Sequence, residues 1–314
     1  MSGDPDTIEL DIVVPVECRG WRLDHFLKRR IGRLSRTRIQ SIIREQIFFS
    51  DGRAARPSAS VRAGETILLR RPAPIEPEVP RHFEVLYEDA SVLVIDKPAG
   101  LPMHTTAKFW RNTLTALLRE RYPDEQMEIA HRIDRETSGA LVIARGREVA
   151  SFLTRAFARR AVEKTYLALV KGQPPDEGRI DQPLKLLDTP SHVMMGPAPD
   201  GLTAVTRFRV VRRFAAHALC EAHPETGRQH QIRVHLQSIG HPIVGDKLYG
   251  ASEALFMRAC DEGVTPELLA AFDGLPRHAL HARRLTFPHP VRQQPVTVEA
   301  PLPADLGDYL AGLR

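Results

Sequence analysis

Apolar side chains recur with helical spacing in two short segments near the start of the chain. In LDHFLKRRI (residues 23–31) and RTRIQSIIRE (residues 36–45) they gather on one face of each predicted helix. Ser35 precedes the second segment and is a suitable N-cap. An Asp51–Gly52 turn and the strand-like run GETILLRR (residues 64–71) complete a small unit.

A proline-rich stretch separates this unit from the rest of the chain. RPAPIEPEVPR (residues 71–81) contains four prolines, which favour an extended, semi-rigid linker. We therefore expect four regions: an N-terminal extension (1–18), the small unit (19–71), a linker (72–81) and a large body (82–314).

The body mixes strand-like and helical segments. Strand patterns are found in FEVLYEDASVLVIDKP (83–98), which holds two strands, GALVIAR (139–145), KTYLALVKG (164–172), AVTRFRVVRRF (204–214) and HALCEAHP (217–224). Helical patterns are found in NTLTALLRERY (112–122), with Asn112 as N-cap, VASFLTRAFARR (149–160) and RQHQIRVHLQSIG (228–240). This order predicts an α+β fold with a mixed, mostly antiparallel sheet and flanking helices.

Basic residues are concentrated in the small unit. Between Arg19 and Arg71 there are 14 Lys or Arg and 4 Asp or Glu, a balance of +10, so the remaining residues carry −5 of the total of +5. A local basic surface is typical of proteins that bind a polyanion, usually nucleic acid. A solvated charged face would give the same pattern without a partner.

Several classes of protein are disfavoured. No apolar run reaches the roughly 18 residues that a membrane-spanning helix needs. The start, MSGDPDTIELD, lacks the basic and apolar parts of a signal peptide. The three cysteines lie far apart with no CxxC, so we expect neither a disulfide framework nor a cysteine zinc site. A cytoplasmic protein is expected, and nothing demands more than a monomer.

The stretch AHRIDRETSGALVIARG (residues 130–146) places one carboxylate among bases, just before a turn and a buried strand. A carboxylate at the mouth of a rigid element is well positioned for chemistry. It can stabilise, or bond to, a glycosidic carbon that becomes positively charged, provided that it stays ionised. A nearby guanidinium would keep Asp134 ionised. On its own, the pattern also fits a turn-capping Asp on a surface loop.

The small unit resembles an S4-type RNA-binding domain over about 50 residues. The resemblance rests on the two basic helices, the turn and the closing strand. One departure is Gln46, where the pattern usually has glycine. The resemblance implies RNA contacts from the exposed basic residues Arg22, Lys28, Arg36, Arg38 and Arg44.

Five stretches of the body together resemble the RluA-type RNA pseudouridine synthases. They are DKPAGLPMH (96–104), HRIDRETSGALVIAR (131–145), KTYLALVKG (164–172), ETGRQHQIRVHLQSIGHPIVGDKLYG (225–250) and HALHARRLTFPHP (278–290). The resemblance implies a bisected mixed sheet with an RNA cleft along its middle. It also implies an isomerase that detaches uracil from C1′ and rejoins it through C5, without metal or cofactor. An S4-type domain before this body is the arrangement of members that modify large-subunit ribosomal RNA.

The same resemblance assigns roles to particular residues. Asp134 would be the catalytic carboxylate, with Arg233 as its ion-pair partner and Tyr166 as the active-site tyrosine. Lys164 shares the strand face of Tyr166 and is a candidate phosphate contact. Arg132 is a candidate for extruding the base, because its flat guanidinium can fill the vacated space. Further candidate RNA contacts are Arg228, His230 and Gln231.

Other functions remain open at this point. A transfer RNA substrate and a catalytically inactive RNA-binding protein both fit parts of the pattern. A nucleosidase or glycoside hydrolase would usually need a second carboxylate, and the sequence offers no clear partner for Asp134. His230 and His235 are five positions apart, which does not place two metal ligands on one helical face. The segment of residues 105–111 is short, which leaves the choice of substrate open. Residues 251–276 suggest a helical insertion without an assigned role.

Overall fold

The computed structural model describes residues 7–31, 34–72, 76–106 and 108–314. They form two compact units, one within residues 1–75 and the other within residues 76–314. None of the helices in these described ranges is long and apolar enough to cross a membrane.

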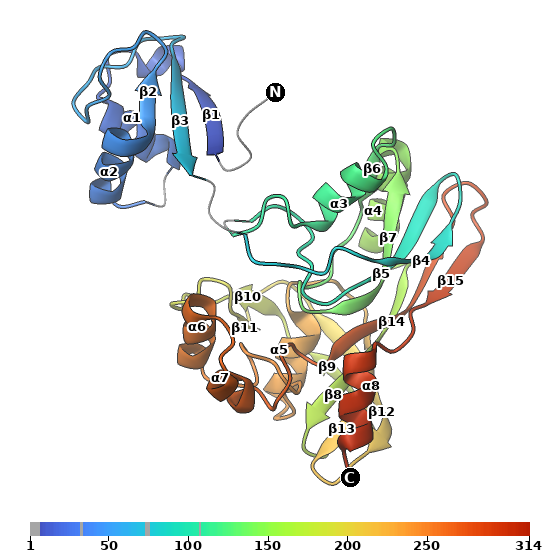
Figure 1. The fold of residues 1–314 in the computed structure, drawn as a ribbon. Helices are drawn as coiled ribbons and strands as arrows, with labels where there is room; N and C mark the ends of the chain where they lie inside the picture. The colour runs from blue at the N-terminus through green and yellow to red at the C-terminus, as the bar shows by residue number, and fades with distance from the viewer. Residues whose placement is uncertain (1–6, 32–33, 73–75, 107) are drawn as a thin grey trace. The chain divides into compact units, whose positions relative to one another are not determined.

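The described part of the first unit combines a three-stranded antiparallel sheet with short helices (Figure 1). Its elements are β1 (Thr7–Val13), η1 (Val16–Cys18), α1 (Leu23–Ile31), α2 (Arg36–Gln46), β2 (Ile47–Phe49) and β3 (Thr66–Pro72). Strand β3 lies between β1 and β2. Both predicted helices are confirmed, and the Ser35 hydroxyl accepts a hydrogen bond from the Arg38 N–H, as an N-cap does.

Strand β1 lies in segment 1–18, which the sequence pattern predicted to be an extension outside the unit. It instead pairs with β3 from Thr7 opposite Pro72 to Val13 opposite Thr66. As an edge strand it buries no residue fully, although its sequence TIELDIV alternates between polar and apolar residues as a half-buried strand does. The unit's core comes mainly from the helices, where Leu23, Leu27 and Ile39 are completely buried.

The second unit holds most of the chain. Its strands are β4 (Glu84–Glu88), β5 (Val92–Lys97), β6 (Met127–Ile129), β7 (Ser138–Arg145), β8 (Glu163–Lys171), β9 (Glu177–Asp181), β10 (Leu184–Leu186), β11 (Met195–Pro197), β12 (Val205–Arg213), β13 (His217–Pro224), β14 (Leu280–Pro288) and β15 (Pro295–Glu299). Its helices are α3 (Leu114–Arg121), α4 (Arg147–Ala158), α5 (Gln231–Ser238), α6 (Glu253–Glu262), α7 (Pro266–Ala271) and α8 (Ala304–Gly312). The predicted α+β class and the mixed sheet with flanking helices are confirmed.

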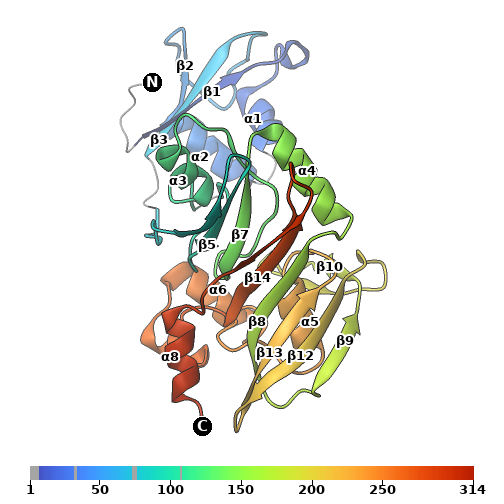
Figure 2. The ribbon, with the colours of Figure 1, turned by 90° about the vertical axis from the view of Figure 1, so that its right-hand side faces the viewer.

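Strand β14 joins the two halves of the main sheet. The strand order is β4-β5-β7-β14-β8-β13-β12-β9, with β6 also paired to β7 and β15 to β14. Among the pairings of the described strands, β7 with β14 is parallel and the others are antiparallel. Figure 2 shows β7, β14, β8 and β13 running side by side. Ala282 of β14 faces Gly139 of β7 on one side and Tyr166 of β8 on the other.

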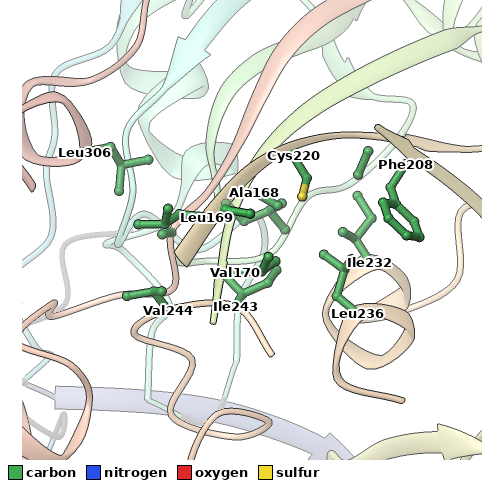
Figure 3. Packing of buried hydrophobic residues seen from close by; sticks show 14 of the residues in the cluster. Ala168, Leu169, Val170, Phe208, Cys220, Ile232, Leu236, Ile243, Val244 and Leu306 are labelled. Carbon is green, nitrogen blue, oxygen red and sulfur yellow. The ribbon is translucent and has the colours of Figure 1, made fainter. Parts of the chain in front are cut away.

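Separate hydrophobic clusters cover the two halves of the sheet. The β5–β7 half is packed on both faces, by α4 through Leu153 and by α3 through Leu117. This explains why β7 is buried along nearly its whole length, as the sequence predicted. On the other half, Ile232 and Leu236 of α5 pack against the strands beside Cys220 (Figure 3). Helix α5 is thereby fixed on the sheet.

Some local details differ from the sequence prediction. The N-cap of α3 is Thr113 and not Asn112, because the Thr113 hydroxyl accepts the Ala116 N–H at 3.3 Å. The Asn112 side chain instead donates to the Pro77 carbonyl oxygen. In the predicted linker, residues 73–75 lie outside the described residues. Glu76 accepts the backbone N–H groups of Arg111 and Asn112, both at 2.7 Å, so this end of the linker is tied to the second unit.

Gly139 permits the close approach of β7 to β14. Its φ is +114°, and an added Cβ would lie 2.3 Å from the carbonyl oxygen of Ala282. Backbone atoms of a paired strand cannot move away as a flexible side chain can. The parallel junction of the sheet therefore requires glycine at this position.

We predict that Gly139→Ala lowers the free energy of unfolding by about 3 kcal/mol or more, from backbone strain and the clash with β14. The matched control is Gly307→Ala in α8, where an added Cβ meets nothing within 4 Å. That change should be neutral or stabilising by about 0.5–1 kcal/mol. Urea unfolding compares the two, and equal midpoints would contradict the prediction.

Candidate active site

A cavity of about 440 Å³ opens in the second unit, beside the junction of β7, β14 and β8. Five segments line it: the loop before β7, the end of α4, the start of β8, the β13–α5 connection with the first turn of α5, and Leu280 at the start of β14. Its size falls in the range of sites that hold small molecules or a single nucleoside. Asp134, Tyr166 and Arg233 all line this cavity.

The loop that carries Asp134 is held at both ends. Ile133, just before it, is buried in the cluster beneath α3. After it, the Thr137 N–H donates to the Asp134 carbonyl oxygen at 3.1 Å and closes a turn. The Thr137 hydroxyl is buried against His278 Nε2 at 2.8 Å. The carboxylate is therefore mounted on a short, braced turn rather than on a free loop.

Lys97 also holds the loop that carries Asp134. This completely buried lysine donates from Nζ to the carbonyl oxygens of Pro98, Leu101 and Arg135, at 2.7, 3.0 and 3.0 Å. Burial lowers the pKa of Lys97 to about 7, while three carbonyl acceptors match the three N–H bonds of its charged form. Lys97 thus ties the end of β5 to the residue that follows Asp134.

Arg233 joins two carboxylates. Its Nη1 donates to Asp134 Oδ2 at 3.0 Å, across 99 positions of sequence. Its Nε and Nη2 donate to both oxygens of Asp246, at 2.6 and 2.9 Å. The guanidinium side chain is only 9% exposed, and its face lies over the Tyr249 ring at 5.0 Å. The bidentate pair with Asp246 fixes the plane of the guanidinium, and that orientation aims Nη1 at Asp134.

The electrostatics favour an ionised Asp134. Burial alone would raise its pKa, but the charge of Arg233 and the hydrogen bond from it hold the pKa below the ordinary carboxyl value. Asp134 Oδ1 accepts no hydrogen bond from any described residue, and the Asp134 side chain is 19% exposed. One carboxylate oxygen therefore remains available on the cavity side of the ion pair.

Asp246 is itself held by a turn. Its Oδ1 accepts the backbone N–H groups of Leu248 and Tyr249, both at 3.0 Å. Gly245 precedes it with φ +73°, and an added Cβ there would lie 2.2 Å from the Arg277 carbonyl oxygen. Together with the pairing to Arg233, these bonds hold the pKa of Asp246 far below its usual range despite burial, which acts in the opposite sense. Asp246 is a permanent anion.

Tyr166 lies on β8, opposite Ala282 of β14, and lines the same cavity as Asp134. Burial, and secondarily the negative charge of Asp134, raise the pKa of its hydroxyl well above the ordinary value. No hydrogen bond or ion pair engages this hydroxyl within the described ranges. A neutral phenol with an unused O–H therefore faces the same cavity as the carboxylate.

Comparisons with known proteins agree with this geometry. The sequence model for RNA pseudouridylate synthases matches residues 91–238. The ribosomal large subunit pseudouridine synthase D of Xanthomonas campestris is 38% identical, in an alignment covering 100% of this chain and 95% of that protein. The protein of the same name from Pseudomonas aeruginosa is 34% identical, covering 98% and 97%.

This chain belongs to the RluA-type RNA pseudouridine synthases. It is an isomerase that converts uridine to pseudouridine in RNA. Human RNA pseudouridylate synthase domain containing 1 has a similar fold, with a TM-score of 0.57 and 27% identity over 72% of this chain and 86% of that one. The resemblance seen in the sequence motifs is confirmed.

The synthase presents several of the predicted cations at its cavity. Arg132, Arg228 and Lys164 all line it, and the two arginines are exposed. Arg228 donates from Nε to the Thr203 carbonyl oxygen at 3.1 Å, and Lys164 donates to the Thr226 carbonyl oxygen at 3.0 Å. Burial lowers the pKa of Lys164 to about 8. These contacts fix the positions of the two side chains but leave their charge facing the cavity.

Gln231 and His230 serve mainly to shape the synthase's cavity wall. The buried Gln231 amide donates to the Val205 carbonyl oxygen and accepts the Arg228 N–H, so its polar atoms are engaged within the protein. His230 Nδ1 is 2.9 Å from the Tyr249 hydroxyl. Burial lowers the pKa of His230 to about 4, so it is a neutral ring that shares this hydrogen bond with Tyr249.

Sequence reasoning gave no role to Asp246, Tyr249 or Lys97, although all three lie in the quoted motifs. An Asp in a turn and an aromatic residue after it look like local structure in sequence alone. His278 begins the last of the quoted stretches, and its contact with Thr137 braces the Asp134 turn. His235 bonds to Thr206 and Gln182. Among the described residues, no three His, Cys, Asp or Glu side chains are grouped to hold a metal ion.

In the first unit, the predicted RNA-binding cations differ in availability. Arg22 and Arg36 both pair with the buried carboxylate of Asp24, at 3.0 and 3.4 Å. Lys28 donates to the Leu34 carbonyl oxygen at 2.6 Å. Arg38 and Arg44 are exposed, and their guanidinium groups have no ion pair in the described part of the chain. Of the five predicted cations, the two that are exposed and without an ion pair among the described residues therefore lie on α2.

Proposed function

We propose that Asp134 is the catalytic carboxylate, acting on a uridine turned out of structured large-subunit ribosomal RNA. The observation that carries the proposal is the Arg233–Asp134 ion pair at the wall of a cavity of nucleoside size. Cleavage of the bond between C1′ and the base nitrogen leaves positive charge on the sugar. An ionised carboxylate with one uncommitted oxygen can bond to that carbon or assist elimination there.

Tyr166 would act on the base. Its ring is placed to stack on the extruded uracil, because it shares the cavity with Asp134. Its raised pKa keeps the hydroxyl protonated at neutral pH. That favours a hydrogen-bond donor over a phenolate base. The turned base would thus be held while it presents C5 to the sugar.

Arg132 would keep the base out of the RNA stack. It is exposed at the cavity, two positions before Asp134, and none of the described residues forms an ion pair with it. A uridine in folded RNA must leave its stack before the enzyme can reach it. A planar guanidinium can occupy the space that the base leaves.

Two observations support large-subunit ribosomal RNA as the substrate. The relatives with that name align along the whole chain, including the first unit. That unit also has the helix order, turn and basic composition of an S4-type RNA-binding domain, with residues 19–71 as its predicted extent. Exposed Arg38 and Arg44 would give it phosphate contacts. A transfer RNA substrate is the alternative that mapping of pseudouridines in cells with and without the gene would reveal.

A nucleosidase is less well supported. The cavity's other carboxylate, Glu225, is paired with Arg207 at 2.7 Å. It is therefore not a free carboxylic acid that could protonate a departing base. Release of free uracil from RNA would nonetheless identify such an activity directly.

Asp134→Asn should reduce tritium release from RNA carrying 5-tritiated uridine by about a thousandfold or more, because the amide cannot act as an anion. RNA affinity should stay within a few-fold of the original. Asp200→Asn, at an exposed carboxylate paired with Lys185, is the control and should retain full activity. Activity retained by Asp134→Asn would overturn the proposal.

Arg132→Ala should slow modification of a structured RNA by roughly tenfold or more and that of an unstructured oligomer of the same sequence much less. Arg135→Ala removes an equal charge from an exposed neighbour whose side chain pairs with Glu136. Single-turnover rates on both RNAs make the comparison. Equal losses on the two RNAs would count against base extrusion.

The double substitution Arg38→Gln/Arg44→Gln should weaken RNA binding and reduce the salt dependence of affinity by about two ions. Arg284→Gln/Arg292→Gln removes the same charge from arginines already paired with Glu299 and Asp89. Titrations at several salt concentrations compare the two. If both double variants show the original slope, the first unit does not contact phosphates through α2.

A further inference from the structure

One residue in the turn between α4 and β8 is of a type that the backbone conformation at its position disfavours. The Arg160 N–H donates to the Phe157 carbonyl oxygen at 3.1 Å, and the Ala161 N–H donates to that of Ala156 at 2.9 Å. These two bonds form a Schellman motif, in which the residue after the C-cap adopts a left-handed conformation and is usually glycine. Here that residue is Arg160, with φ +59°.

No contact within the described chain accounts for this choice. Arg160 is exposed, and its guanidinium has neither a hydrogen bond nor an ion pair among the described residues. A non-glycine residue in the left-handed region costs about 1 kcal/mol or more. Glycine would therefore make the same turn with less strain and lose no visible interaction. Strain of this kind is concentrated at functional sites.

Arg160 lines the same cavity as Asp134 and Tyr166. It stands at the carboxyl end of α4, where Phe157 and Ala158 form part of the wall. The carboxyl end of a helix carries partial negative charge from its free carbonyl groups. A cavity that admits RNA would repel phosphates at this wall unless a cation covered it. Arg160 supplies such a cation on the cavity lining, directly after the C-cap of α4.

We propose that Arg160 binds a phosphate of the RNA strand that carries the target uridine. The proposal rests on the function proposed above, in which RNA enters this cavity. Arg132, Arg160 and Arg228 come from three separate segments, the loop before β7, the α4–β8 turn and the β13–α5 connection. Arg228 is braced by the Thr203 carbonyl oxygen, whereas the guanidinium N–H groups of Arg160 have no partner among the described residues and are free for a phosphate. A guanidinium can hold two phosphate oxygens at once.

The test uses four variants of the full chain. Arg160→Asn keeps a residue that tolerates the left-handed conformation but removes the charge, Arg160→Gly relaxes the turn and removes the charge, and Arg160→Lys keeps the charge. Arg159→Asn is the control, because it removes an equal charge at the adjacent exposed C-cap, which does not line the cavity. The probe is large-subunit ribosomal RNA transcribed in vitro, with binding measured by titration at several salt concentrations.

Arg160→Asn and Arg160→Gly should weaken RNA binding about 5- to 20-fold and lower the salt slope by about one, while Arg159→Asn leaves both nearly unchanged. In the modification reaction, both variants should show a higher KM and a nearly unchanged kcat. Arg160→Lys should recover most of the loss. Arg160→Gly should unfold at the original temperature or above, which separates binding from folding. Original affinity and slope in Arg160→Asn and Arg160→Gly would overturn the proposal.

The binding titration separates this proposal from the proposed function. Failure of Asp134→Asn to abolish modification would overturn the catalytic assignment, yet the salt slope of the Arg160 variants would still report on phosphate binding. Conversely, unchanged slopes in those variants would refute the role of Arg160 even if Asp134 proves to be essential.

Discussion

The sharing of one guanidinium between two carboxylates is the interaction on which the site depends. Burying a charge is costly unless it is paired and hydrogen-bonded, and Arg233 meets both conditions through Asp246. Because that bidentate pair already neutralises Arg233, Asp134 adds a second negative charge and leaves the triad with a net charge of −1. In the proposed reaction, this excess negative charge acts on the sugar carbon that becomes positive. A simple one-to-one pair would hold Asp134 more firmly but leave less negative charge to act on substrate.

The main sheet brings Asp134 and Arg233 to the same cavity as Tyr166. Asp134 precedes β7, Tyr166 lies on β8, and the two strands do not pair with each other but with opposite edges of β14. The distance between carboxylate and phenol is therefore set by one residue of β14, Ala282, and by the absence of a side chain at Gly139. Helix α5 brings Arg233 to the same place by packing on the second half of the sheet. The site depends on both halves being joined correctly.

Sequence reasoning predicted what local periodicity or a long motif encodes. Helices α1 to α5 and about half of the strands follow from apolar spacing, and the pairing of Asp134 with Arg233 came from the motif resemblance, which the 3.0 Å contact agrees with. It did not assign β1, although TIELDIV alternates between polar and apolar residues, nor β14, which joins the two halves of the sheet. It gave no role to Asp246 or Lys97, because their partners are backbone groups and a distant arginine that only the tertiary structure brings near. The left-handed Arg160 leaves no periodic signal at all.

The cations around the cavity divide into two kinds by burial, and the division reconciles an anionic catalyst with a polyanionic substrate. Arg233 is buried and fully committed to carboxylates, so it contributes no positive potential that a phosphate could reach. Arg132, Arg160 and Arg228 are exposed at the rim and can screen the phosphates from Asp134. A substrate held at the rim by its backbone leaves only an uncharged nucleoside to enter beside the carboxylate. In the proposed function, geometry would thus remove the repulsion between the two anions, and Asp134 would keep its charge while RNA binds.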